Sequence, residues 1–100
     1  MFYFLFHAAP DEGNPEKDER GGAYVCCWID RNTRAEAEKA ARAMISKEGW
    51  LIEKLEETAK VDRSSYDDNP EGLELYEQAL VDKQVLVFSI YPINDQADEE

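Results

Sequence analysis

The chain has 100 residues, of which 43% are hydrophobic and 34% are charged, and it is expected to form one domain with one modest core. Its 23 acidic residues outnumber its 11 basic residues and give a net charge of -12. This balance argues against nucleic-acid binding, because phosphate contacts need clustered lysine and arginine, and against docking on anionic lipid. No apolar run approaches the roughly 20 residues that span a bilayer.

The acidic residues are unevenly distributed along the chain. Residues 1–50 hold 9 acidic and 7 basic residues, whereas residues 51–100 hold 14 acidic and 4 basic residues. A charge far from zero keeps small domains apart in solution, which is one interpretation of this excess. The other is a surface complementary to a basic partner.

The beginning of the chain is predicted to form a β-hairpin. Residues 2–9 are rich in aromatic side chains and are followed by Pro10, which is typical of a buried strand. They lack the positively charged start of a signal peptide, so we expect a cytoplasmic protein. Residues 10–22 contain two prolines, three glycines and seven charged residues, which predicts a solvated, mobile loop. Residues 23–30 (AYVCCWID) predict the second strand.

A helix is predicted over residues 33–48. Thr33 and Glu36 have the spacing of a capping box, with Asn32 as a competing cap. Gly49 is the expected end of the helix. Five apolar residues recur at helical spacing, which predicts that one face packs in the core: Ala37, Ala40, Ala41, Met44 and Ile45.

A third strand is predicted over residues 50–58. The apolar run that follows Gly49 favours a strand over a continued helix. Ile52 and Leu55 would fall on opposite faces of a regular strand, so a bulge is expected between them.

A second helix and a fourth strand are predicted next. Asn69 is a good helix cap, and Pro70 at the first helical position loses no needed hydrogen bond. The helix is expected to run to about Lys83. Residues 85–91 (VLVFSIY) predict a buried last strand, and the acidic tail 93–100 is expected to be disordered.

The element order β-β-α-β-α-β predicts an α+β fold. We expect a two-layer α/β sandwich with a four-stranded sheet and two helices on one face, ferredoxin-like in style. Residues 1–92 would form a single domain with 10–22 as a mobile loop, followed by the tail at 93–100.

The two faces of the predicted sheet differ in composition. Residues of one parity form a plain apolar core under the helices: Phe2, Phe4, Phe6, Ala8, Ala23, Val25, Cys27, Ile29, Leu86, Phe88 and Ile90. The opposite parity mixes large rings with polar groups: Tyr3, Leu5, His7, Tyr24, Cys26, Trp28, Asp30, Val87, Ser89 and Tyr91, joined by Lys54 and Glu56, or by Glu53 and Glu57.

A fully solvated face would not usually hold so many large rings. This second face could be a homodimer interface, because aromatic side chains concentrate at interfaces. It could also be covered by the 10–22 loop or the tail, or it could bind a small molecule or a peptide. The candidate binding residues are Tyr3, His7, Tyr24, Trp28, Asp30 and Tyr91.

Little in the sequence supports catalysis. His7 is the only histidine, and paired with Asp30 or Glu56 it could act as a general base. No nucleophile motif, phosphate loop or metal-ligand spacing accompanies it, so we expect no catalytic residue, metal or cofactor. The adjacent Cys26 and Cys27 point to opposite faces of a strand and cannot easily pair, so we expect reduced thiols.

Four segments together resemble a family of small acidic bacterial proteins of uncharacterised function. They are residues 23–30, the Gly49-Trp50 step, residues 69–82 (NPEGLELYEQALVD) and residues 88–92 (FSIYP). The resemblance implies a bacterial cytoplasmic protein, and it implies no activity, cofactor or site residue.

These observations favour a non-enzymatic protein-interaction module that self-associates through the aromatic sheet face. One alternative is an acidic inhibitor, or immunity-type protein, that binds a basic partner. Another is a small-molecule binder or enzyme centred on His7, Asp30 and Tyr91. The expected partner is therefore a protein, either a second copy or a basic protein, and neither nucleic acid nor a membrane.

Overall fold

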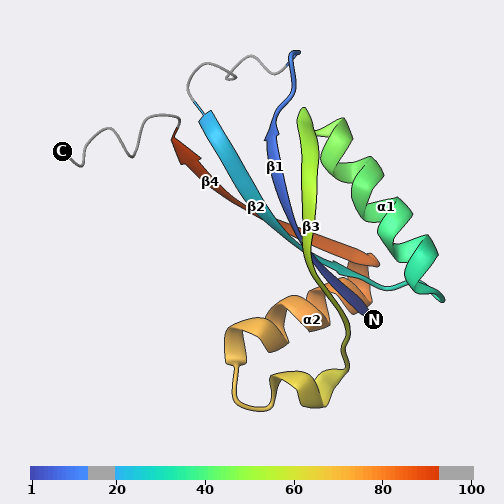
Figure 1. The fold of residues 1–100 in the computed structure, drawn as a ribbon. Helices are drawn as coiled ribbons and strands as arrows, with labels where there is room; N and C mark the ends of the chain where they lie inside the picture. The colour runs from blue at the N-terminus through green and yellow to red at the C-terminus, as the bar shows by residue number, and fades with distance from the viewer. Residues whose placement is uncertain (14–19, 93–100) are drawn as a thin grey trace.

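The computed structural model describes residues 1–13 and 20–92, which form one open sheet and two α-helices (Figure 1). The predicted α+β class and the order β-β-α-β-α-β are confirmed. The elements are β1 (Phe2–Pro10), β2 (Arg20–Ile29), α1 (Arg34–Lys47), β3 (Trp50–Lys60), the 3-10 helix η1 (Arg63–Tyr66), α2 (Pro70–Asp82) and β4 (Gln84–Pro92).

The connection between β1 and β2 is shorter than the predicted loop of residues 10–22. Pro10 belongs to β1 and pairs with Trp50, and β2 begins at Arg20. The rest of that predicted loop includes residues 14–19, which lie outside the described residues, as does the predicted tail 93–100.

The four strands pair in the order β3-β1-β2-β4, and each neighbouring pair is antiparallel. The N-terminal hairpin therefore supplies the two inner strands, and β3 and β4 are the edges. Side chains of Phe2–Ala8 alternate between buried and half-buried along β1. Because the side-chain period of a strand is two, one set faces α1 and the other set faces the opposite side of the sheet.

The bulge predicted in the third strand is confirmed. The register between β1 and β3 shifts twice, between Leu5 and Phe6 and between His7 and Ala8. As a result Leu55 pairs with Phe6, Ile52 pairs with Ala8, and both aliphatic side chains pack against the core.

Helix α1 covers the first face of the sheet as predicted. The Thr33 side chain caps it by accepting a hydrogen bond from the backbone N–H of Glu36, and Gly49 follows its end with a φ of 93°. Phe4 and Phe6 stack in the core with ring centroids 5.9 Å apart. Small side chains let the helix approach the strands closely, and its buried residues are Ala37, Ala41 and Ile45.

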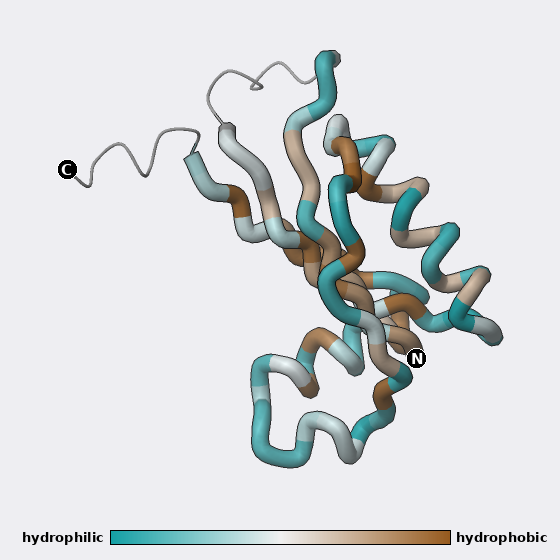
Figure 2. Tube along the Cα trace, viewed as in Figure 1, coloured by the Kyte–Doolittle hydropathy of each residue, from teal (hydrophilic) through white to brown (hydrophobic). Residues whose placement is uncertain are grey.

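Strand β4 is less buried than predicted. All the expected core residues of β1 and β2 are buried, but Leu86 and Phe88 are only partly buried and Ile90 is 43% exposed. Helix α1 packs on β3, β2 and β1, so the edge strand β4 keeps apolar side chains in the open. Figure 2 shows that the middle of the sheet is hydrophobic, whereas the turn between η1 and α2 is hydrophilic.

The position of the second helix differs from the prediction of two helices on one face. α1 runs beside β3, whereas η1 and α2 lie at one end of the opposite face (Figure 1). Trp28 shares that face with Tyr3 and donates a hydrogen bond from Nε1 to the Tyr66 hydroxyl of η1 at 2.7 Å. The Tyr66 ring in turn contacts Tyr76 of α2. Aromatic side chains on this face supply the apolar surface that the second helix needs.

Among the described residues, no helix is both long and apolar enough to cross a membrane.

The unequal burial of the strands predicts unequal mutational effects. We expect Phe6→Ala, at a fully buried position, to lower the free energy of unfolding by about 3–5 kcal/mol. We expect Ile90→Ala, on the exposed edge, to lower it by only about 1 kcal/mol. Urea denaturation of both variants measures the difference, and equal losses would contradict the exposed position of Ile90.

Candidate functional site

The second sheet face brings together most of the residues that the sequence placed there. Across β1 and β2, Tyr3 pairs with Trp28, Leu5 with Cys26, and His7 with Tyr24. The segment formed by η1 and α2 covers only the Tyr3–Trp28 end of this face. The face is therefore divided into a covered aromatic end and an open end around His7.

At the open end, the rings of His7, Tyr24 and Tyr91, which come from three strands, form a cluster. The centroid of its imidazole ring lies 4.8 Å from the Tyr24 ring and 5.9 Å from the Tyr91 ring, with which it is nearly parallel. The Tyr24 and Tyr91 rings are 6.1 Å apart. Glu53 of β3 reaches the same imidazole, and we call His7, Tyr24, Tyr91 and Glu53 the His7 cluster.

The polar groups of the His7 cluster form a relay. Nδ1 of His7 lies 3.2 Å from Oε1 of Glu53, and Nε2 lies 2.6 Å from the Tyr91 hydroxyl. An ionised carboxylate can only accept hydrogen bonds, so this contact favours the tautomer with its proton on Nδ1. Nε2 then accepts the hydrogen bond from Tyr91. This arrangement can orient the Tyr91 hydroxyl and draw its proton toward the imidazole.

A glycine makes room for the Tyr91 hydroxyl. A Cβ atom added to Gly22 would lie 2.3 Å from the Tyr91 oxygen and 3.0 Å from the carbonyl oxygen of Ala8. The tyrosine therefore lies directly against the backbone of β2, at the place where the register of β2 with β4 shifts. Any side chain at position 22 would push this ring away from His7.

Neither of the two carboxylates predicted to pair with His7 contacts its imidazole ring. Asp30 follows the far end of β2, six residues beyond the residue that pairs with His7, which is roughly 20 Å along a strand. Glu56 pairs with Lys54 at 3.8 Å. The shifts in register of β3 bring Glu53 to the imidazole instead, so neither predicted dyad forms.

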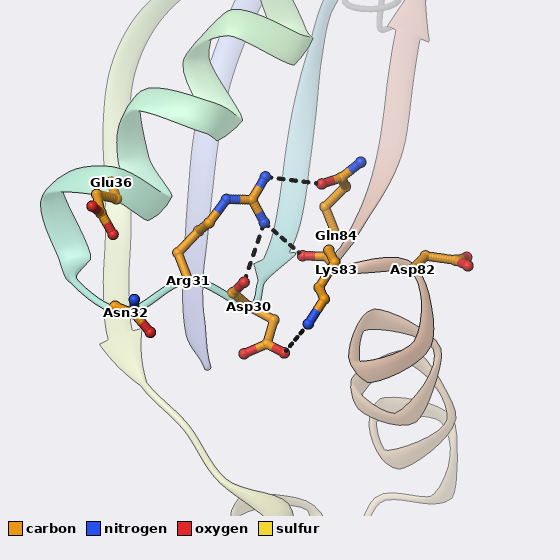
Figure 3. A pocket seen from close by; sticks show the side chains of 7 residues that line it. All are labelled: Asp30, Arg31, Asn32, Glu36, Asp82, Lys83 and Gln84. Atoms are coloured by element: carbon orange, nitrogen blue, oxygen red, sulfur yellow. Dashed lines mark hydrogen bonds and ion pairs between the residues drawn. The ribbon is translucent and has the colours of Figure 1, made fainter.

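Asp30 belongs to a polar cluster that joins two loops, shown in Figure 3. Its backbone N–H donates to the carbonyl oxygen of Lys83, and its carboxylate lies 3.9 Å from Nζ of that lysine. Arg31 donates to the Lys83 carbonyl at 3.4 Å and to Oε1 of Gln84 at 3.2 Å. These contacts connect the end of β2 to the turn before β4. The residues that line the pocket in Figure 3 therefore have a structural role.

Tyr3 and Trp28 lie at the covered end of the second face. Their ring centroids are 5.1 Å apart, and the Tyr3 hydroxyl donates to Sγ of Cys26 at 3.5 Å. Burial, with a further contribution from Cys26, raises the pKa of the Tyr3 hydroxyl far above its ordinary value. This hydroxyl therefore stays protonated at physiological pH and keeps its role as a donor.

The two adjacent cysteines are both free, as expected. Cys27 is buried in the core and Cys26 is half-buried on the second face. Burial raises the pKa of the Cys27 thiol to about 12, so this thiol is not a nucleophile near neutral pH. Across residues 1–13 and 20–92, no three His, Cys, Asp or Glu side chains gather into a possible metal site.

One residue of the covered end was not among the predicted site residues. Tyr66 of η1 bonds to Trp28 and holds η1 against the sheet. Tyr66 is the only aromatic residue between residues 59 and 68, a stretch that is otherwise mostly polar. An isolated ring in such a stretch is a signal that could have been used to anchor this segment to the aromatic face.

In comparisons with known proteins, no family model matches the chain, and neither a curated protein nor a solved structure matches it. The resemblance to small acidic bacterial proteins therefore stays a prediction.

The contact between Gly22 and Tyr91 predicts a specific effect of a single methyl group. We expect Gly22→Ala to displace the Tyr91 hydroxyl and abolish its hydrogen bond to Nε2 of His7. The ¹⁵N chemical shifts of the His7 ring should then change as they do in Tyr91→Phe, which removes the same hydroxyl without a clash. Gly13→Ala is the matched control, since a Cβ there meets no atom of the described residues within 4 Å. Unchanged His7 shifts in Gly22→Ala would contradict this account of the cluster.

Proposed function

We propose that the protein is a non-enzymatic interaction module that self-associates through β4. One observation carries the proposal. The edge strand Gln84–Pro92 contains no charged residue in a chain of which 34% is charged. Both of its faces also expose apolar side chains, including Ile90 beside the first sheet face and Val87 on the second.

The two edges of the sheet differ sharply in this respect. Proteins protect edge strands from pairing with other chains by means of charged side chains and bulges. β3 has both forms of protection, because its register with β1 shifts twice and it carries Glu53, Lys54, Glu56, Glu57 and Lys60. β4 has no charge, and its one irregularity lies at its end, between Arg20 and Gly22 of its partner strand. Edge pairing is thus disfavoured at β3 and left open at β4.

A second copy of the chain fits this edge. An antiparallel pair of β4 strands related by a twofold axis would continue the sheet from one protomer into the other. Leu86 and Phe88 of one protomer would then lie beside the same residues of its partner. The exposed apolar surface that α1 leaves over β4 would be covered in the same step, which adds a hydrophobic contribution to the new backbone hydrogen bonds.

The aromatic face contributes to this interface only in part. Tyr24 is 43% exposed and pairs with Ser89 of β4, but its ring packs on His7, so it would flank the interface rather than form its centre. Trp28 is 7% exposed beneath η1, so Trp28→Lys would disturb folding rather than report on association. The interface proposed from the sequence therefore moves from the whole face to its β4 side.

A pair of valine substitutions tests the proposal. We expect the wild-type chain to sediment as a dimer, and Val87→Lys to raise the dissociation constant at least about tenfold, because each interface would bury two unpaired charges. Val81→Lys is the matched control, since Val81 is 76% exposed and belongs to α2 rather than to β4. A wild-type monomer at high micromolar concentration, or equal effects of the two variants, would contradict self-association through β4.

Salt dependence separates this proposal from an acidic inhibitor. Two copies that each carry a net charge of -12 repel one another, and salt screens this repulsion. We therefore expect the dimer to become tighter as sodium chloride rises from low to moderate concentration, as measured by sedimentation equilibrium. Association with a basic partner would weaken under the same change. A dimer that dissociates with added salt would contradict an uncharged contact along β4.

A further inference from the structure

A cavity of about 340 Å³ lies between the covered end of the second sheet face and η1. Three aromatic side chains line it: Tyr3 of β1, Trp28 of β2 and Tyr66 of η1. Glu57 of β3 contributes a carboxylate, and Ala59 adds a small apolar surface. No lining residue comes from β4, so the cavity is independent of the proposed dimer contact.

The rings that line this cavity are held in place by the protein. Tyr3 and Trp28 pack against each other with ring centroids 5.1 Å apart and planes inclined at 57°, so their mutual orientation is fixed. The Tyr66 hydroxyl accepts from Nε1 of Trp28 at 2.7 Å. The same ring lies against Gly72, where an added Cβ would be 2.6 Å from Cδ1 of Tyr66. A ligand would therefore meet rings that are already positioned, and binding would cost little ordering of side chains.

The charge around the cavity is negative. Among the described residues, Glu57 is the only charged residue that lines it, and no lysine or arginine does so. The negative charge of Glu57 is one of the effects that raise the pKa of Tyr3, so its field extends to the rings. Across residues 57–69, four acidic residues outnumber two basic residues, Lys60 and Arg63, so the local charge stays negative.

We propose that this aromatic cavity binds an alkylated ammonium cation. Aromatic rings attract cations through the negative potential of their faces, and they also offer apolar surface to methyl groups. Glu57 supplies a counter-charge for the same ligand. An anion would be repelled by Glu57, and a bare metal ion would lack ligands, because the residues described hold no group of three suitable side chains.

Choline and its neutral carbon isostere, 3,3-dimethylbutan-1-ol, form the central test. The two compounds have nearly the same shape and differ in the positive charge. In ¹H–¹⁵N spectra of the full chain, we expect choline to shift the indole N–H signal of Trp28 saturably and the isostere to bind roughly tenfold more weakly. Trp50 is the internal control, because it lies in the core on the other sheet face. Sodium chloride at equal concentration controls for ionic strength.

Variants of two neighbouring carboxylates complete the test. Glu57→Gln should weaken choline binding severalfold, whereas Glu56→Gln, outside the cavity lining, should leave it unchanged. Absence of a saturable Trp28 shift, equal affinity for choline and its isostere, or equal effects of the two variants would overturn the proposal. A trimethyllysine tripeptide distinguishes the source of the cation: tighter binding than choline assigns it to a modified protein, and no tighter binding assigns it to a free solute.

The outcome is independent of the oligomeric state. Val87→Lys should retain choline binding even where it abolishes the dimer, because no β4 residue lines the cavity. Loss of choline binding in that variant would overturn the placement of the ligand in this cavity.

Discussion

The antiparallel register between β1 and β2 is the constraint on which the rest of the structure depends. It places Phe4 opposite Cys27 and Phe6 opposite Val25 on one face, and Tyr3 opposite Trp28 on the other. A slip of one residue in either strand would exchange the core set with the aromatic set. Because these two strands are the inner strands of the sheet, the register decides at once what α1 buries and what remains for η1, α2 and the His7 cluster.

Features with a local cause could be predicted from the sequence. The helical recurrence of alanine predicted the buried face of α1, and the Thr33 cap was visible as a spacing of three residues. The conflicting parity of Ile52 and Leu55 predicted a bulge, because both are apolar and neither is easily left in water. Each of these features depends only on residues that lie close together in the sequence.

Features that depend on distant pairing could not be predicted. The run VLVFSIY predicts a strand, but it is equally compatible with a central strand and with an edge strand. The exposure of Ile90 could therefore not be inferred. The sheet face on which α2 packs depends on which side chains each face presents. That composition is known only when the register of both β1 and β2 is known. The contact between His7 and Glu53 depends on two shifts in register whose positions the sequence does not specify.

Charge is arranged so that only one edge of the sheet is protected. A net charge of -12 disfavours contact between copies over most of the surface. The charged side chains of β3 likewise disfavour pairing at its edge. β4 carries no charge over its whole length. If the proposed dimer forms, an uncharged edge on a highly charged molecule would favour association there over approaches that bring like charges together.

Two tyrosines from the second half of the chain are fixed to the inner strands in the same physical way. Tyr91 lies against Gly22 and bonds to His7, and Tyr66 lies against Gly72 and bonds to Trp28. In each case a missing side chain admits a ring, and the hydroxyl at its tip bonds to a ring nitrogen on the second sheet face. The two contacts attach β4 and η1 to opposite ends of that face. The His7 cluster and the aromatic cavity thus share one structural feature. In both, a glycine lets a tyrosine ring lie close to the backbone, and this contact positions the tyrosine hydroxyl.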